Sequence, residues 1–452
     1  MKFNRFKLGL LLFLAIISLN GLSQDTWSLE DCINYATMNN IAVKQQQLTV
    51  RAAEVEFGQS KYEFLPDLSG GLNYTYISNK ALNPMTSSWE THQLNDGIIG
   101  ITSNLVLFDG FKQYNAVSKK KFDLMQSLAS VEKLKSDITL VLVSAYLQIL
   151  LCKENVEIAI SQLEITEQHV KRMEKMVEIG NSEKGLLLDI RAQKAIDNMR
   201  LTNAKNQLDI SQLALIQMLN LDSVTSINIK VPDQLNIKET PLPAMDSLFR
   251  VAAENLPHIK YAEYNVNSSK KALAISKGYH SPNLSLRYNY YLTKNAAIYP
   301  SDQFPIALPQ NNPISGHFGD NRYQSISLNL KVPIYDKGLI NKNISLAKIA
   351  FANSEYHLEE IKQILYREIQ QAYLDATASL AKYHSTVEAV RSTEEAFFYT
   401  QEKYTLGYVG ITEFNDAKNN FLRTRSELTQ AKYDYILKTK ILDFYIGLPI
   451  TL

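Results

Sequence analysis

The sequence is poor in cysteine and tryptophan and carries almost no excess charge. Only two cysteines and two tryptophans occur in 452 residues, and 47 lysines and arginines face 46 aspartates and glutamates. Such a balance argues against a nucleic-acid-binding protein, which needs a concentrated basic face. Cys32 and Cys152 stand on separate helical stretches and are more typical of packed thiols than of a disulfide, although a pairing between them stays open.

Signatures of catalysis are also missing. The seven histidines are scattered along the chain. No His-Glu-x-x-His, Cys-x-x-Cys, phosphate-binding glycine loop or nucleophile elbow occurs. We therefore expect a protein that is not an enzyme and that has no metal site and no cofactor.

Long uninterrupted apolar runs are absent beyond the N-terminus. Three basic residues among the first seven precede an apolar run from Leu8 to Leu19, and small polar residues follow. This pattern predicts a secretory signal peptide over residues 1–24. The run is short for a membrane span, so a retained anchor is the less favoured alternative.

Helix-breaking residues are missing from two long stretches. Neither proline nor glycine occurs from Phe111 to Ile179 or from Leu339 to Leu406. Apolar residues recur three and four positions apart between Leu358 and Leu380, the period of a helix with one buried face. Each stretch predicts a helix of roughly 100 Å at 1.5 Å per residue. A compact globular domain has no need of helices so long, so we expect them to span a distance.

The two stretches are copies of each other. When the sequence is aligned with itself at an offset of 227 positions, Asp109–Leu221 aligns with Asp336–Leu448 without a gap. We interpret this register as an internal duplication. The repeats cover residues 25–221 and 245–448, and a proline-containing connector covers residues 222–244.

Each repeat also contains two stretches in which apolar and polar residues alternate. They run from Leu68 to Tyr76, from Ile99 to Leu107, from Leu284 to Tyr290 and from Ile326 to Val332. Alternation over about ten residues is typical of transmembrane β-strands, although a soluble sheet with one buried face has the same pattern. Four strands cannot close a sheet in lipid, where open edges are not tolerated. Two copies of the chain would supply eight strands and three copies would supply twelve.

Together these features resemble the TolC-type outer-membrane efflux family over essentially the whole mature chain. The resemblance rests on the order of several weak motifs, which are Leu65-Pro66, Leu107-Phe108-Asp109-Gly110, Ile334-Tyr335-Asp336-Lys337-Gly338, and the turns at Gly180 and Gly407. It implies a mostly α-helical homotrimer whose long antiparallel hairpins form a periplasmic α-barrel. Four strands per chain would join a twelve-stranded β-barrel in the lipid of the outer membrane.

The same resemblance implies a function. The protein would be the passive exit duct of a tripartite efflux or type I secretion system, for small molecules that cross the periplasm and the outer membrane. A periplasmic adaptor (membrane fusion) protein and an inner-membrane pump would be its partners, and no nucleic acid would be involved. The alternative is a secreted periplasmic coiled-coil adaptor or scaffold without a pore.

The resemblance also implies a gate near the second hairpin tip. Glu413 and Asp416 match the family's acidic pair at the periplasmic entrance, and Tyr404 matches a helix-linking tyrosine. Asp189, the duplicate of Asp416, is a weaker gate candidate, and Val409 stands where some members have an arginine that holds the entrance shut. Carboxylates that converge on a narrow axis would attract cations and repel anions. Alternatively, these acids only interact with the dipole at a helix start.

The tips themselves are the expected adaptor contacts, although they could also be no more than turns. Their residues are Gly180, Asn181 and Ser182 in the first tip and Gly407, Tyr408, Val409 and Gly410 in the second.

Overall fold

The computed structural model describes residues 26–82, 87–221, 226–232, 237, 243–294 and 321–452. The predicted signal peptide over residues 1–24 lies outside these ranges, as does part of the predicted connector at 222–244. The described residues form two compact units. One unit contains residues up to 49, 127–261 and 358–452, and the other contains residues 50–126 and 262–357. Each unit therefore takes segments from both repeats.

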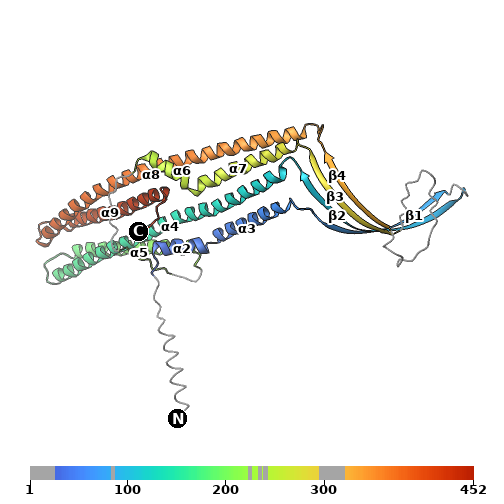
Figure 1. Ribbon diagram of the computed structural model, residues 1–452. Coiled ribbons are helices and arrows are strands. Elements are labelled where there is room, and N and C mark those ends of the chain that lie inside the picture. The colour runs from blue at the N-terminus through green and yellow to red at the C-terminus, as the bar shows by residue number, and fades with distance from the viewer. Residues whose placement is uncertain (1–25, 83–86, 222–225, 233–236, 238–242, 295–320) are drawn as a thin grey trace, which may run out of the picture. The chain divides into compact units, whose positions relative to one another are not determined.

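The order of elements repeats along the chain (Figure 1). Two helices, two strands, one long helix and one shorter helix follow one another, and then the same series recurs. The first series is α2 (Leu29–Asn39), α3 (Ile41–Tyr62), β1 (Ser69–Leu82), β2 (Trp89–Phe108), α4 (Lys112–Glu178) and α5 (Lys184–Leu219). The second is α6 (Met245–Asn255), α7 (Pro257–Gly278), β3 (Asn283–Lys294), β4 (Asn321–Lys331), α8 (Leu339–Thr405) and α9 (Ile411–Tyr445). The predicted mostly helical fold with four strands and an internal duplication is confirmed.

The long helices α4 and α8 have 67 residues each. Their starts are capped in the same way, because the Asp109 carboxylate accepts hydrogen bonds from the backbone N–H groups of Lys112 and Gln113, both at 3.0 Å. Asp336 does the same for Gly338 and Ile340. An acidic cap satisfies N–H groups that have no partner inside the helix.

The long helices end at glycines in the left-handed region. Gly180 has a φ of 76° and Gly407 a φ of 81°, a conformation that costs glycine no steric strain. The amide of the residue after each glycine then bonds back to a helix carbonyl, from Asn181 to Met176 at 2.8 Å and from Tyr408 to Lys403 at 2.9 Å. This is the Schellman arrangement, and it turns the chain into α5 and α9.

The N-terminal segment of each repeat forms two consecutive helices rather than one continuous helix. Residues 28–62 form α2 and α3, because Asn40 leaves the helical conformation and its side chain caps the second helix through the Ala42 N–H at 2.9 Å. In the second repeat the break precedes Pro257, which starts α7. Proline fits the first turn of a helix, where an N–H would have no partner. A run of helical residues cannot by itself reveal such a break.

The four strands form one antiparallel sheet in the order β1-β2-β3-β4. The register brings apolar residues opposite each other on one face, as where Leu105 faces Leu286 and Leu286 faces Leu328. These side chains remain outside a core in the single chain, where Leu328 is 64% exposed. Within the described residues, β1 and β4 have a neighbouring strand on one side only.

A core surrounds Tyr146 in the larger unit. This side chain is 1% exposed, and its hydroxyl donates to the Lys230 carbonyl at 2.5 Å. Beside this core, Trp27 and Ile229 form an isolated parallel β-bridge. Among the described helices, α4 contains one 18-residue window apolar enough to cross a bilayer, and 39% of that window is buried within the chain.

Both cysteines lie in or beside this core. They are free and buried, so the open question of a Cys32–Cys152 disulfide is answered here by two packed thiols. Burial raises the pKa of the Cys32 thiol to about 12. The thiol is therefore protonated and unreactive at neutral pH.

Candidate functional site at the hairpin tips

The tips of the two hairpins expose both backbone and apolar side chains. The first tip joins α4 to α5, and the second joins α8 to α9. The residues beside the tip glycines are among the most exposed apolar side chains, with Ile179 at 74%, Leu406 at 71% and Tyr408 at 78%. Most of the predicted adaptor-contacting residues are exposed, whereas Ser182 and Val409 are partly buried.

Ser182 and Val409 face a cavity of about 330 Å³ that lies between the two tips. Its walls come from the ends of α4 and α8, the start of α9 and both turns. Five of the predicted site residues line it, namely Ser182, Tyr404, Gly407, Val409 and Gly410. Glu413, Asp416 and Asp189 do not.

Tyr404 holds the hairpins together through its ring. The ring stacks on Phe414, with centroids 4.8 Å apart and planes at 24°. It also meets the edge of His169 on the first hairpin, with centroids 5.6 Å apart. Burial raises the pKa of the Tyr404 hydroxyl, so the side chain is neutral. The Tyr404 ring therefore contacts residues of both α4 and α9.

His169 completes this aromatic group. Its ring lies 4.5 Å from that of Phe414, which is 1% exposed. Burial lowers the pKa of His169 to about 4, and the positive charges of Lys418 and Arg172 add to the effect. The imidazole is therefore neutral at neutral pH, as packing against aromatic rings requires.

The predicted gate acids lie on another side of α9. Glu413 is in its first turn, and both Glu413 and Asp416 are exposed, about 60° apart around the helix. Phe414, which lies between the two acids in the sequence, and Lys418, which follows them, are buried in the core instead. Asp189 is exposed on α5. Glu413 and Asp416 are three residues apart on α9, whereas Asp189 lies on the other hairpin.

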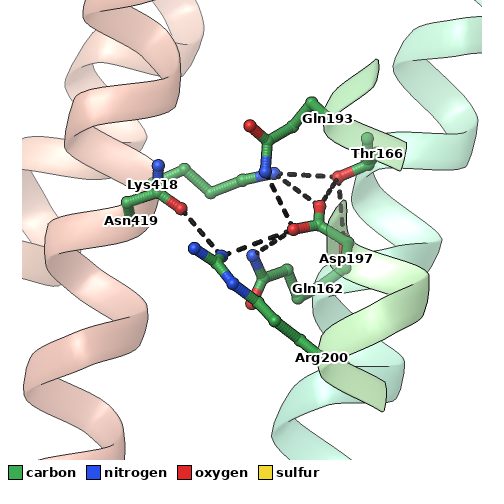
Figure 2. Close-up of polar contacts among 7 residues, drawn as sticks. All are labelled: Gln162, Thr166, Gln193, Asp197, Arg200, Lys418 and Asn419. Atoms are coloured by element: carbon green, nitrogen blue, oxygen red, sulfur yellow. Dashed lines mark hydrogen bonds and ion pairs between the residues drawn. The ribbon is translucent and has the colours of Figure 1, made fainter. Parts of the chain in front are cut away.

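A buried polar cluster, which we did not predict, joins the hairpins near the tips (Figure 2). The Lys418 ammonium on α9 lies 3.1 Å from the Asp197 carboxylate on α5 and 2.8 Å from the Thr166 hydroxyl on α4. The Lys418 and Asp197 side chains are 1% and 0% exposed. Asp197 also accepts hydrogen bonds from Gln162 and from Thr166, both at 2.7 Å. Every oxygen of this buried carboxylate is thus satisfied.

The edge of the cluster is closed by Arg200, Gln193 and Asn419. Arg200 bonds to Asp197 at 3.4 Å and to Asn419 at 3.2 Å, and so connects α5 to α9 a second time (Figure 2). Burial lowers the pKa of Lys418, and the nearby Asp197 carboxylate opposes that shift. One signal in the sequence could have revealed the cluster. Lys418 follows Phe414 by four positions and precedes Phe421 by three, which places a charge on an apolar face.

A second contact between the hairpins lies closer to the tips. The Arg172 guanidinium on α4 donates to the backbone carbonyl of Thr405, the last residue of α8, at 3.0 Å. Val409 contributes an apolar side chain to the wall of the cavity. In this chain the arginine contact between the tips comes from the first hairpin.

Comparison with known proteins gives relatives along the whole chain. A family model described as "Outer membrane efflux protein" matches residues 32–221 and 248–448. Outer membrane protein TolC of Escherichia coli (strain K12) is 20% identical over 445 residues, which cover 95% of this chain and 84% of that protein. Outer membrane efflux protein BepC of Brucella suis is 20% identical over 413 residues, or 89% of this chain and 81% of that protein. Proteases secretion protein PrtF of Dickeya chrysanthemi is 19% identical over 434 residues, or 94% of this chain and 89% of that protein.

Solved structures show the same fold. CusC superimposes with a TM-score of 0.79 at 16% identity, and covers 95% of this chain and 96% of its own. The CmeC outer membrane channel of Campylobacter jejuni superimposes with a TM-score of 0.77 at 17% identity, over 93% of this chain and 85% of its own.

Proposed function

This chain belongs to the outer membrane efflux protein family and is an outer-membrane channel of the efflux and type I secretion kind. We propose that it works as a homotrimer, bound through its hairpin tips to a periplasmic adaptor protein that connects it to an inner-membrane pump. The duct itself is passive, and the pump supplies both the energy and the choice of cargo. The family consists of transport channels rather than enzymes.

The observation that carries the trimer is the unfinished sheet. It has four strands, and its apolar face is exposed in the single chain. The outer strands β1 and β4 offer unpaired backbone groups, which cost several kcal/mol each in lipid. Three copies joined edge to edge would pair every strand in a closed barrel of twelve strands, wide enough for a lumen.

Two further features support roles for the tips. The exposed apolar residues Ile179, Leu406 and Tyr408 form a surface that suits a protein partner, and we assign the predicted tip residues to adaptor binding. Glu413 and Asp416 lie on the unpacked side of α9, where copies of the chain arranged around an axis could bring them together. We therefore assign the cation-selective gate to this pair, with Asp189 as a weaker contributor and Tyr404 as the residue that positions the tip.

Assembly and conductance together test this function. Protein extracted from outer membranes should run as a heat-stable trimer and should produce ion-conducting steps in planar lipid bilayers. A monomeric, water-soluble protein without conductance would instead support the secreted scaffold.

A further inference from the structure

The two faces of the sheet differ in their chemistry. One face is apolar, as where Leu286 on β3 lies opposite Leu328 on β4. The residues that alternate with these form the other face, where Thr102 lies opposite Asn289 and Asn289 lies opposite Ser325. In an outer-membrane channel the apolar face of a strand meets lipid, and the polar face lines the water-filled lumen. The polar face is therefore the surface along which cargo moves.

One row of residues interrupts this polar face. Gly71, Gly100, Tyr291 and Tyr323 lie directly opposite one another, with one residue on each of the four strands. Opposed residues of neighbouring strands share a face, and side chains on one strand return to the same face every second residue. Tyr291 follows Asn289 by two positions, so the row belongs to the polar face. Two strands offer bare backbone there, and the other two offer aromatic rings.

The two tyrosine rings of this row are stacked and held in place. Their planes are 20° apart, and their centroids are 6.1 Å apart. The Tyr291 ring lies over Gly100, because a Cβ added at Gly100 would collide with the ring. The Tyr291 hydroxyl donates to the Asn289 side-chain oxygen at 3.3 Å, and the Asn289 amide donates to the Ser325 hydroxyl at 3.1 Å. These hydrogen bonds fix the direction in which the rings point.

The row ends at an open position on β1. A Cβ added at Gly71 would have no heavy atom of the described residues within 4 Å, so the Tyr291 ring covers Gly100 but does not reach Gly71. A glycine inside a strand often marks a place where a ligand approaches the backbone closely. Aromatic rings attract one another at centroid distances of about 4.5–7 Å. There is thus room for one more flat ring over Gly71, beside the ring of Tyr291.

We propose that this row is a binding site for the planar aromatic ring of a cargo molecule, which lies over Gly71 and stacks on Tyr291. The proposal rests on the proposed duct, because it requires the polar face to line a lumen. The ligand class follows from the surface, since the tyrosines offer the faces of their rings and the glycines leave the backbone bare. An assembled trimer has three such sites, so the barrel retains aromatic cargo for longer than it retains cargo of the same charge without a ring.

Block of the ion current tests the site. The flat aromatic cation 9-aminoacridine, added to the full-length channel in planar bilayers, should reduce the current at concentrations at which tetrapropylammonium, a cation without a ring, has no effect. The Tyr291→Ala/Tyr323→Ala variant should require about tenfold more 9-aminoacridine for half-maximal block, because the stacking contacts are lost. Equal block of this variant and the wild type, or equal block by the two cations, would overturn the proposal.

Two further variants serve as controls. Tyr288→Ala/Tyr290→Ala removes two tyrosines from the apolar face of the same strand and should leave the block unchanged. Tyr291→Phe/Tyr323→Phe keeps both rings without their hydroxyls and should also keep the block. A loss of block in the phenylalanine variant as large as in the alanine variant would refute a stacking site and assign the binding to the hydroxyl groups.

A ring built into the open position gives a second test. Gly71→Tyr should occupy the space beside Tyr291 and weaken the block by 9-aminoacridine, whereas Gly70→Tyr, on the opposite face of β1, should not. Gly71→Tyr channels that are blocked as readily as the wild type would refute the position assigned to the ligand. Channels that conduct but fail both tests would leave the duct intact and remove this site, whereas a chain that does not conduct would remove the duct itself.

Discussion

The ammonium of Lys418 and the carboxylate of Asp197 lie 3.1 Å apart in the described core, 221 residues apart in the sequence, with almost no solvent access to either. Removal of both charges from water is costly, and only their mutual attraction and the surrounding hydrogen bonds offset that cost. The pair is consequently sensitive to the loss of one member.

We expect Lys418→Met to destabilise the protein by about 3–5 kcal/mol, because it leaves Asp197 buried without its counter-ion. The double variant Lys418→Met/Asp197→Leu should be much less destabilised than either single variant, since no unpaired charge remains. Denaturant unfolding followed by circular dichroism measures both. Equal losses in the single and double variants would contradict the account.

The exposed pair of Arg423 and Glu427 provides the control for this experiment. Its side chains are 64% and 48% exposed. Glu427→Ala should change the unfolding free energy by about 1 kcal/mol or less, because solvent screens a surface pair.

The gate assignment predicts a change in ion selectivity. The double substitution Glu413→Ala/Asp416→Ala should lower the preference for cations in planar bilayers, because it removes two carboxylates per copy from the entrance. The control Glu388→Ala/Glu394→Ala removes two exposed acids from α8 and should leave selectivity unchanged. If reversal potentials stay the same in both variants, the acids only decorate the start of α9.

Tyr404 acts through its ring, so its two obvious substitutions should differ. Tyr404→Phe keeps the stack on Phe414 and should behave as the wild type. Tyr404→Ala loses an aromatic pair worth about 0.5–1.5 kcal/mol beyond its buried area, which should loosen the tip and raise conductance. Single-channel recordings distinguish these outcomes. A Tyr404→Phe channel as open as Tyr404→Ala would shift the role to the hydroxyl.

His169 should make the tip sensitive to acid. The pKa of His169 is about 4 in the folded protein and 6.5 in the unfolded chain, so the unfolded chain is protonated first as the pH falls. The stability that the neutral imidazole contributes is complete above about pH 6.5 and is lost as pH falls towards 4. Lys418 and Arg172, which face the ring, add repulsion to the imidazolium, and Tyr404 beside it is neutral.

Hydrogen exchange between pH 7 and 4 measures this effect at residues 166–182 and 404–414. We expect faster exchange there on acidification, and His169→Phe should remove most of the change while it preserves the contact with Phe414. His384→Phe, at an exposed position on α8, is the control. An acid response that survives in the His169→Phe variant would assign it to other groups.

The sequence alone determined the long helices, their duplication and the turns between them. Breaker-free stretches predicted helices that occupy residues 112–178 and 339–405, and the same shift of 227 positions relates their starts. Alternation predicted the four strands, and glycine predicted the tips. These features depend on local backbone preferences and on periodicity, which neighbouring residues encode.

The tertiary structure decided which faces meet. Periodicity places Lys418 on the inward side of α9, but it does not show that Asp197 and Thr166 supply the partners on other helices. Nor does it show that Asn40 divides the first helical segment, or that Arg172 rather than a residue at 409 bridges the tips. Such contacts depend on the packing of segments that are remote in sequence. A buried charge is stable there only when the fold places a residue of opposite charge or a hydrogen-bond partner beside it.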